Sequence, residues 1–393
     1  MGKIMDYVHW RGDLNFLKDP FNDIDALVLA LLSYLPFQGI VPGIESNKEI
    51  TLKETARQLF LKAPTEKRKS KKSSSTVSSS FDSEITELLN QAANCARFEN
   101  MLLSGFEENT DFVVGRQFAA VTFTLKNSEI KKVIAFRGTD NSIVGWKEDF
   151  QLAYMEQIPA QESARKYLER TIGVFSSQFI ACGHSKGGNL AMYAGSHLDA
   201  IRQIKLKKII NFDGPGFDFT IVQQNAFLHL EHKIINYVPE ESMVGLLLDS
   251  VGKRIVVSSA ARFVFQHDAF NWGVERTKFV PGRLSNNAKL MEQTLKSWLT
   301  EISISEREIF LEALFDILGV SEGKVIKFDP QENLKDINYI LAKYSKMDKK
   351  TKALITHIAK SLTAEVRKTI SSTIEEKLPK GTSGKKKATR KQD

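Results

Sequence analysis

Cysteine is scarce in this chain of 393 residues, which contains only Cys95 and Cys182. Two cysteines exclude a disulfide framework and any zinc site built mainly from thiolates. The sequence also lacks a Walker-type phosphate loop, a His-Glu-x-x-His pair and a glycine-rich dinucleotide motif. We therefore expect neither a metal ion nor an organic cofactor.

Long apolar runs are missing as well. The longest, residues 24–37, is interrupted by Asp25, Ser33 and Pro36 and is too short to cross a bilayer. The N-terminus has no apolar segment of the kind that directs secretion. These features predict a cytoplasmic protein without a transmembrane helix.

Positive charge is not spread over the chain, although the net charge is +8. Residues 62–80 and 379–393 each contain six Lys or Arg against one acid, so each carries +5 and the remainder of the chain carries −2. This distribution argues against a basic face that binds a specific nucleic acid. A weak contact with a polyanion or an anionic surface, through 64–80 and 379–393, is the alternative use of this charge.

Strand and helix patterns alternate through the middle of the chain. Apolar runs typical of buried strands occur at 118–125, 132–136, 178–182, 208–212, 233–238 and 254–258. Helical patterns are predicted at 25–35, 51–61, 83–103, 165–173 and 188–197, and after residue 285 at 287–300, 305–319, 333–344 and 348–377. This alternation predicts a mainly parallel sheet covered on both faces.

The same patterns divide the chain into five regions. We predict a helical N-terminal part of the core (1–63), a disordered basic, serine-rich loop (64–80), an α/β core (81–284), a helical region (285–378) and a disordered basic tail (379–393).

A serine nucleophile is the strongest chemical prediction. Ser185 lies in Gly-His-Ser-Lys-Gly at 183–187, between an apolar strand and a helix. This context is typical of a nucleophile elbow, where Gly183 and Gly187 avoid collisions in a strained turn. The backbone N–H of Lys186 would then serve as one oxyanion donor.

A base and an acid must accompany that serine, in the chain order serine, acid, histidine. His267 is the favoured base because it follows the last predicted strand in a loop. Glu241, after the strand at 233–238, is the favoured acid, and Asp213 and Glu240 remain open. Thr139, after Gly138 at the end of an earlier strand, is the second predicted oxyanion residue.

Several of these motifs together resemble a known family. Phe-Arg-Gly-Thr at 136–139, Gly-Trp-Lys-Glu-Asp-Phe at 145–150, Gly-His-Ser-x-Gly-Gly-Asn at 183–189 and Gln-His-Asp-Ala-Phe-Asn-Trp at 266–272 are similar to motifs of the Mbeg-like bacterial α/β-hydrolases, relatives of class 3 (fungal-type) lipases. The resemblance covers roughly residues 4–280. It implies that Ser185 is the nucleophile, His267 the base and Thr139 the oxyanion residue, whereas Glu241 falls where the lipases have Asp.

These observations predict an α/β-hydrolase fold with an N-terminal helical extension and a C-terminal helical segment. The expected activity is hydrolysis of a carboxylester or lipid-like acyl ester through an acyl-enzyme. Two alternatives stay open: a thioesterase or amidase with the same triad, and a non-catalytic scaffold that binds a polyanion through its basic segments.

Overall fold

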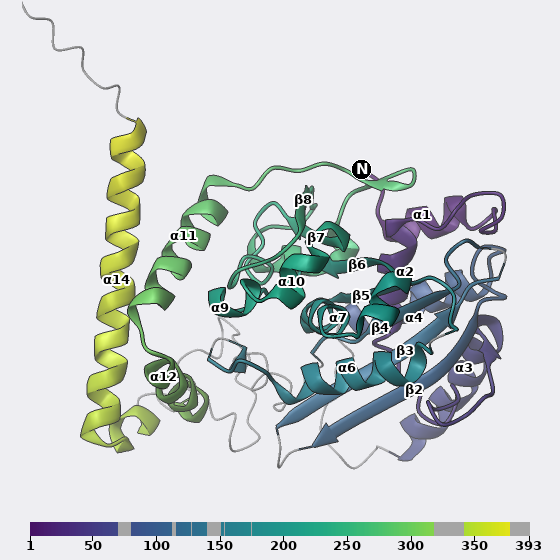
Figure 1. The fold of residues 1–393 in the computed structure, drawn as a ribbon, viewed down its shortest axis with the longest axis horizontal. Helices are drawn as coiled ribbons and strands as arrows, with labels where there is room; N and C mark the ends of the chain where they lie inside the picture. The colour runs from purple at the N-terminus through teal and green to yellow at the C-terminus, as the bar shows by residue number, and fades with distance from the viewer. Residues whose placement is uncertain are drawn as a thin grey trace, which may run out of the picture.

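One mixed sheet organises the computed structural model (Figure 1). The residues that the structure describes are 1–69, 80–111, 115–126, 128–139, 151–152, 154–173, 175–317 and 342–377. Within these ranges the strands form an eight-stranded sheet that follows chain order: β1 (Ile50–Thr51), β2 (Leu102–Asp111), β3 (Arg116–Thr124), β4 (Lys132–Phe136), β5 (Phe179–His184), β6 (Leu206–Phe212), β7 (Ile234–Pro239) and β8 (Lys253–Val257). Strands β1 to β4 pair antiparallel, and β4 to β8 pair parallel.

The parallel half of the sheet agrees closely with the sequence patterns. Its strands β4 to β7 are buried runs of β-branched and aromatic residues, which is why their apolar signature is nearly continuous. The α/β-hydrolase fold predicted from these runs is confirmed. The sequence patterns do not predict strand β2. Its second half is polar and exposed, and the helical pattern at 83–103 covers its first two residues. Helix α4 (Ser80–Ala93) in fact ends before β2 begins.

Helices cover both faces of this sheet. On one face α2 (Asp23–Leu32) crosses β4, β5 and β6, with α1 (Ile4–Arg11) and α4 beside it. On the other face α7 (Lys186–Ser196) covers β4, β5 and β6, and α6 (Pro159–Thr171) covers β3. Two separate apolar clusters result, one under each helical layer. Helix α2 is apolar along most of its length and is buried on most sides; Asp25 is its buried charged residue, and the Asn22 side chain caps its first turn.

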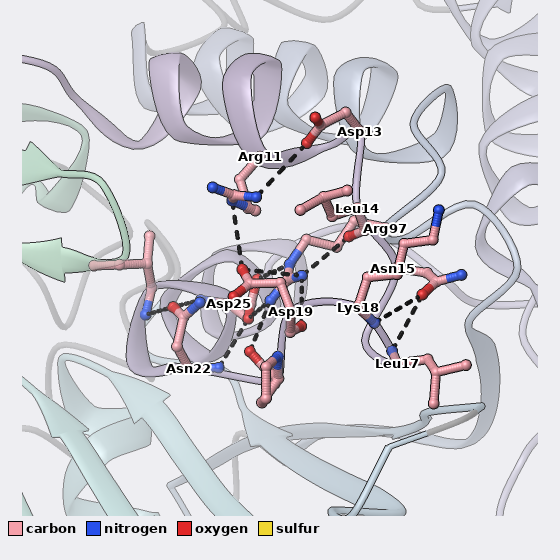
Figure 2. Close-up of polar contacts among 12 residues, drawn as sticks. Arg11, Asp13, Leu14, Asn15, Leu17, Lys18, Asp19, Asn22, Asp25 and Arg97 are labelled. Carbon is pink, nitrogen blue, oxygen red and sulfur yellow. Dashed lines mark hydrogen bonds and ion pairs between the residues drawn. The ribbon is translucent and has the colours of Figure 1, made fainter.

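A buried polar cluster joins α1 and α2 to the chain that follows α4 (Figure 2). The Arg97 guanidinium donates to both oxygens of Asp25, over 2.7 Å from Nε and 2.6 Å from Nη2. Tyr7 also donates to Asp25, over 2.7 Å. Neither the Asp25 nor the Arg97 side chain is exposed to solvent. The cluster therefore fixes three N-terminal segments against one another.

The segment predicted as a basic loop is partly helical. Helix α3 (Leu52–Lys69) continues beyond its predicted end at residue 61, so that 64–69 belong to it. Residues 66–69 are Glu, Lys, Arg and Lys, which are good helix formers and favour a helical backbone there. Residues 70–79 lie outside the described part of the chain.

Within the described residues, three long helices follow the sheet. They are α11 (Asn286–Glu301), α12 (Ile304–Ile317) and α14 (Lys349–Lys377), and α14 packs against the other two at the side of the molecule in Figure 1. Ion pairs connect α11 to the core: Arg254 with Glu292 over 2.9 Å, and Lys296 with Asp249 over 2.9 Å. Most of the predicted helix at 333–344, and the whole tail at 379–393, lie outside the described residues.

No helix within the described ranges combines the length and the apolar character that crossing a membrane requires.

Candidate active site

Ser185 lies at the sharp turn between β5 and α7. Its backbone has φ 58° and ψ −135°, a left-handed conformation that is strained for a residue with a side chain. The two glycines of the motif allow the turn to close. A Cβ on Gly183 would lie 2.2 Å from the carbonyl carbon of Gly187, and one on Gly187 would lie 2.1 Å from the carbonyl oxygen of Phe136. This is the geometry of a nucleophile elbow, which presents a serine hydroxyl above the sheet.

His267, which is distant from Ser185 in the sequence, lies beside it in the structure. It is the last residue of the short helix η2 (Phe263–His267), and its Nε2 lies 3.0 Å from the Ser185 hydroxyl oxygen. A quarter of its side chain is exposed. The two side chains are 82 residues apart in sequence, and the structure brings them within hydrogen-bond distance.

The carboxylate that faces His267 is Asp213, which corrects the preference for Glu241. Asp213 Oδ2 lies 2.7 Å from His267 Nδ1. Asp213 directly follows β6, and its positive φ of 52° turns the chain sharply at the end of that strand. The chain order serine, acid, histidine is kept, but the acid follows the first strand after the nucleophile rather than the second.

The loop after β7 contributes hydrogen-bond donors instead of the acid. The Ser242 hydroxyl and the Gly245 N–H both donate to Asp213 Oδ1, over 2.5 Å and 3.1 Å. Glu241 contacts Gln266: its N–H donates to the Gln266 side chain over 2.8 Å. Glu240, the third candidate, accepts from the Ser258 hydroxyl over 3.3 Å. The loop therefore holds the carboxylate of Asp213 in place.

The predicted oxyanion residues lie beside the nucleophile. Lys186 begins helix α7, whose first N–H groups have no partner within the helix and form a partly positive end. The Lys186 ammonium is buried and donates to the Gln117 side chain on β3 over 2.9 Å, so it is engaged away from the serine. Thr139 is the third residue after the end of β4 and is partly buried. A Cβ on its neighbour Gly138 would lie 3.1 Å from the Ser185 Cβ, so this end of β4 adjoins the elbow.

Two residues of this neighbourhood were not predicted from the sequence. Ser242 follows Glu240 and Glu241 in the sequence, and a serine in that context gives no indication that it will bind a distant aspartate. Tyr34 follows the apolar helix α2, and its hydroxyl lies 3.1 Å from Nδ1 of His184. An isolated tyrosine near the N-terminus carries no motif that could have revealed this contact.

Groups of metal-ligating side chains and surface cavities are other features that can mark a functional site. In the described part of the chain, no three His, Cys, Asp or Glu side chains are grouped so as to hold a metal ion. Surface cavities of about 670 Å³ and 520 Å³ are lined by residues such as Arg170 and His9, and neither is lined by Ser185, Asp213 or His267. The hydrogen-bonded group of Ser185, His267 and Asp213 identifies the site better than cavity size does, because it places a serine hydroxyl within hydrogen-bond distance of a base.

The sequence matches a family model described as Mbeg1-like over residues 92–316, more than half of the chain. No curated protein matches. Among solved structures, the chain is similar to one titled "Crystal structure of M37 lipase", with 18% identity and a TM-score of 0.33. That similarity covers 56% of this chain and 68% of the other.

Proposed function

The chain belongs to the Mbeg1-like family, and from that premise and the contacts of Ser185 we propose that it is a serine hydrolase that cleaves an acyl ester. The observation that carries the proposal is the continuous series Ser185–His267–Asp213, with separations of 3.0 Å and 2.7 Å. A serine beside a histidine whose other nitrogen faces a buried carboxylate is the arrangement that nucleophilic acyl transfer needs.

In the proposed reaction, His267 Nε2 takes the hydroxyl proton as Ser185 attacks the substrate carbonyl. Asp213 accepts from Nδ1, keeps the imidazole in the required tautomer and stabilises the imidazolium. The Lys186 N–H and Thr139 would stabilise the tetrahedral oxyanion. His267 then protonates the leaving alcohol, and a water molecule that it activates releases the acid from the acyl-enzyme.

Apolar side chains near the triad support an acyl substrate. Phe265, two residues before His267, is 72% exposed, and Met243, beside Ser242, is 41% exposed. Large exposed apolar groups on both the segment of His267 and the loop after β7 favour an apolar chain over a charged ligand. The substrate class that we propose is therefore a carboxylester with an apolar acyl group.

The test is labelling with a fluorophosphonate, which reacts with a serine that is activated by a base and flanked by oxyanion donors. We expect labelling of the wild type and none of Ser185→Ala or His267→Ala. Ser196→Ala is the matched control. Ser196 is a buried serine at the far end of α7, the helix that Ser185 precedes, and it is distant from His267 in the chain. Equal labelling of Ser185→Ala, or no labelling of a folded wild type, would refute the proposal.

Chromogenic substrates then define the bond that is cleaved. We expect p-nitrophenyl butyrate to be hydrolysed faster than the matching thioester and anilide. Faster thioester or anilide cleavage would replace the esterase by a thioesterase or an amidase with the same triad. Thr139→Ala should lower kcat by about 10²- to 10³-fold, the usual cost of removing one oxyanion donor.

A further inference from the structure

A second histidine, His184, lies directly behind the base. It is the last residue of β5, and its ring centroid is 4.8 Å from that of His267. Its ring also contacts Tyr34 and Phe81, with centroid separations of 6.0 Å and 6.3 Å. His184 is 3% exposed. The proposed reaction does not use it, although it contacts the base.

The hydrogen bonds of His184 determine its tautomer. Nε2 lies 2.8 Å from the backbone carbonyl oxygen of His267, which can only accept, so Nε2 must donate. Burial, together with the neighbouring His267, lowers the pKa of His184 to about 3. The ring is therefore neutral, and Nδ1 is an acceptor. Tyr34 satisfies that acceptor by donating its hydroxyl over 3.1 Å.

Tyr34 occupies a position that the fold leaves open for it. Its hydroxyl also lies 3.3 Å from the backbone carbonyl oxygen of His184. A Cβ on Gly138 would lie 2.0 Å from that hydroxyl oxygen, so the close approach of Tyr34 requires a glycine at the end of β4. The Tyr34 side chain thus connects the chain after α2 to the end of β5, and its hydroxyl lies close to Gly138 in the chain that follows β4.

We propose that Tyr34 and His184 are positioning residues, which hold the backbone of His267 through the series Tyr34 hydroxyl, His184 imidazole and His267 carbonyl. This inference rests on the proposed function. The base reaches Ser185 from a 3-10 helix of five residues, an element with poor intrinsic hydrogen bonding. A donor fixed behind its carbonyl limits the displacement of the imidazole. A misplacement of about 1 Å costs roughly 100-fold in rate, so this support affects kcat.

The neutral state of His184 also contributes to the proposed positioning of His267. During acylation His267 becomes positively charged, and a charged ring at 4.8 Å would oppose that step. Because burial keeps His184 neutral, it can donate to the His267 carbonyl without repelling the imidazolium. A lysine or arginine could supply the same hydrogen bond but would add the unfavourable charge.

The test compares three variants by kcat and KM for p-nitrophenyl butyrate. Tyr34→Phe removes one hydroxyl and should lower kcat by about tenfold, with KM within about twofold. His184→Leu removes the donor and should lower kcat by about 100-fold. His184→Gln keeps an N–H near the position of Nε2 and should recover most of that loss. A purely structural role would not give recovery by glutamine alone.

A second tyrosine–histidine pair, at the C-terminal end of α7, supplies matched controls. Tyr193 and His197 stack with ring centroids 4.0 Å apart, and His197 Nδ1 lies 2.8 Å from the Tyr193 carbonyl oxygen. Tyr193→Phe and His197→Leu should leave kcat unchanged. Unchanged kcat in Tyr34→Phe and His184→Leu, or a glutamine variant as slow as the leucine variant, would overturn the proposal.

An independent readout separates this inference from the proposed function. Nitrogen-15 NMR at pH 7 should show His184 as the Nε2–H tautomer in the wild type. If the wild type hydrolyses no ester, the proposed function fails, and the tautomer still decides whether the hydrogen-bond series exists. An Nδ1–H tautomer would overturn it. Should His184→Leu not fold, Tyr34→Phe and His184→Gln carry the kinetic comparison.

Discussion

Two aspartates, Asp25 and Asp213, are both completely buried, yet they face different partners. Asp25 accepts from Arg97 and from the backbone N–H of Asn22 (Figure 2), and it also accepts from the Tyr7 hydroxyl. Asp213 accepts from the Ser242 hydroxyl, the Gly245 N–H and His267. Each carboxylate is thus surrounded by at least three donors, which offsets the cost of burying a charge.

The difference lies in what each partner does with its proton. Arg97 stays charged at every accessible pH and is wholly buried, so it does not exchange a proton with Asp25 or with a substrate. His267 gains and loses a proton, and a quarter of its side chain is exposed, so it can meet a substrate. Similar burial therefore gives a structural pair in one region and, under the proposed function, a reactive pair in the other. The nature of the donor, rather than the degree of burial, indicates function.

The largest effect is expected for the reactive pair. Asp213→Asn should lower kcat by about 10⁴-fold, because an amide stabilises the wrong imidazole tautomer while keeping the side-chain shape. The free energy of unfolding should change far less than kcat. The measurement is ester hydrolysis per folded molecule. Glu241→Gln is the control and should leave kcat within about twofold; the reverse ranking would return the acid role to Glu241.

The structural pair should show the opposite profile. Asp25→Asn leaves the Arg97 charge uncompensated in the interior, and we expect the free energy of unfolding to fall by about 3–5 kcal/mol. Urea denaturation measures this loss. The value of kcat per fluorophosphonate-reactive site should be unchanged. A large fall in kcat per reactive site would break the contrast between the two aspartates.

His184 extends the comparison to a buried group whose partners are neutral. Its pKa is lowered from 6.5 to about 3, mainly by burial. Between those values the unfolded chain binds a proton that the folded protein does not, so stability decreases as the pH falls below 6.5. The expected decrease is about 1.4 kcal/mol per pH unit. Urea denaturation at pH 6.5, 5.5 and 4.5 should show this slope as a difference between wild type and His184→Gln; parallel curves would contradict it.

The smallest effect is expected for a donor to the reactive carboxylate. Ser242→Ala removes one of the hydrogen bonds to Asp213 and should lower kcat by about tenfold, because Asp213 then loses orientation rather than charge. Ser258→Ala is a matched control, since Ser258 donates to Glu240 instead. Similar kcat values for the two variants would show that Asp213 needs no support from the loop.

The sequence was sufficient for the parallel strands, the elbow and the pairing of Ser185 with His267. These depend on local patterns and on chain order, both of which can be read directly. The choice of Asp213 over Glu241 could not be read, because both follow apolar strands and both are carboxylates. What separates them is the turn after β6 and the donors from residues 242 and 245, which only tertiary structure brings together. The role of Tyr34 was hidden for the same reason.

The pairing of β5 with β6 sets the separation of nucleophile and acid. His184 is registered with Phe212, so Ser185 and Asp213 are the next residues on adjacent strands, and the Ser185 N–H donates to the Phe212 carbonyl over 2.9 Å. The connection between α7 and β6, which includes α8 (Ala200–Lys205), takes no part in that pairing. Insertions or deletions in this connection are therefore tolerable during evolution, whereas a one-residue slip of β6 would turn Asp213 to the opposite face of the sheet. The separation of Ser185 and Asp213 depends on the hydrogen bonds between β5 and β6. It does not depend on the length of the connection between α7 and β6.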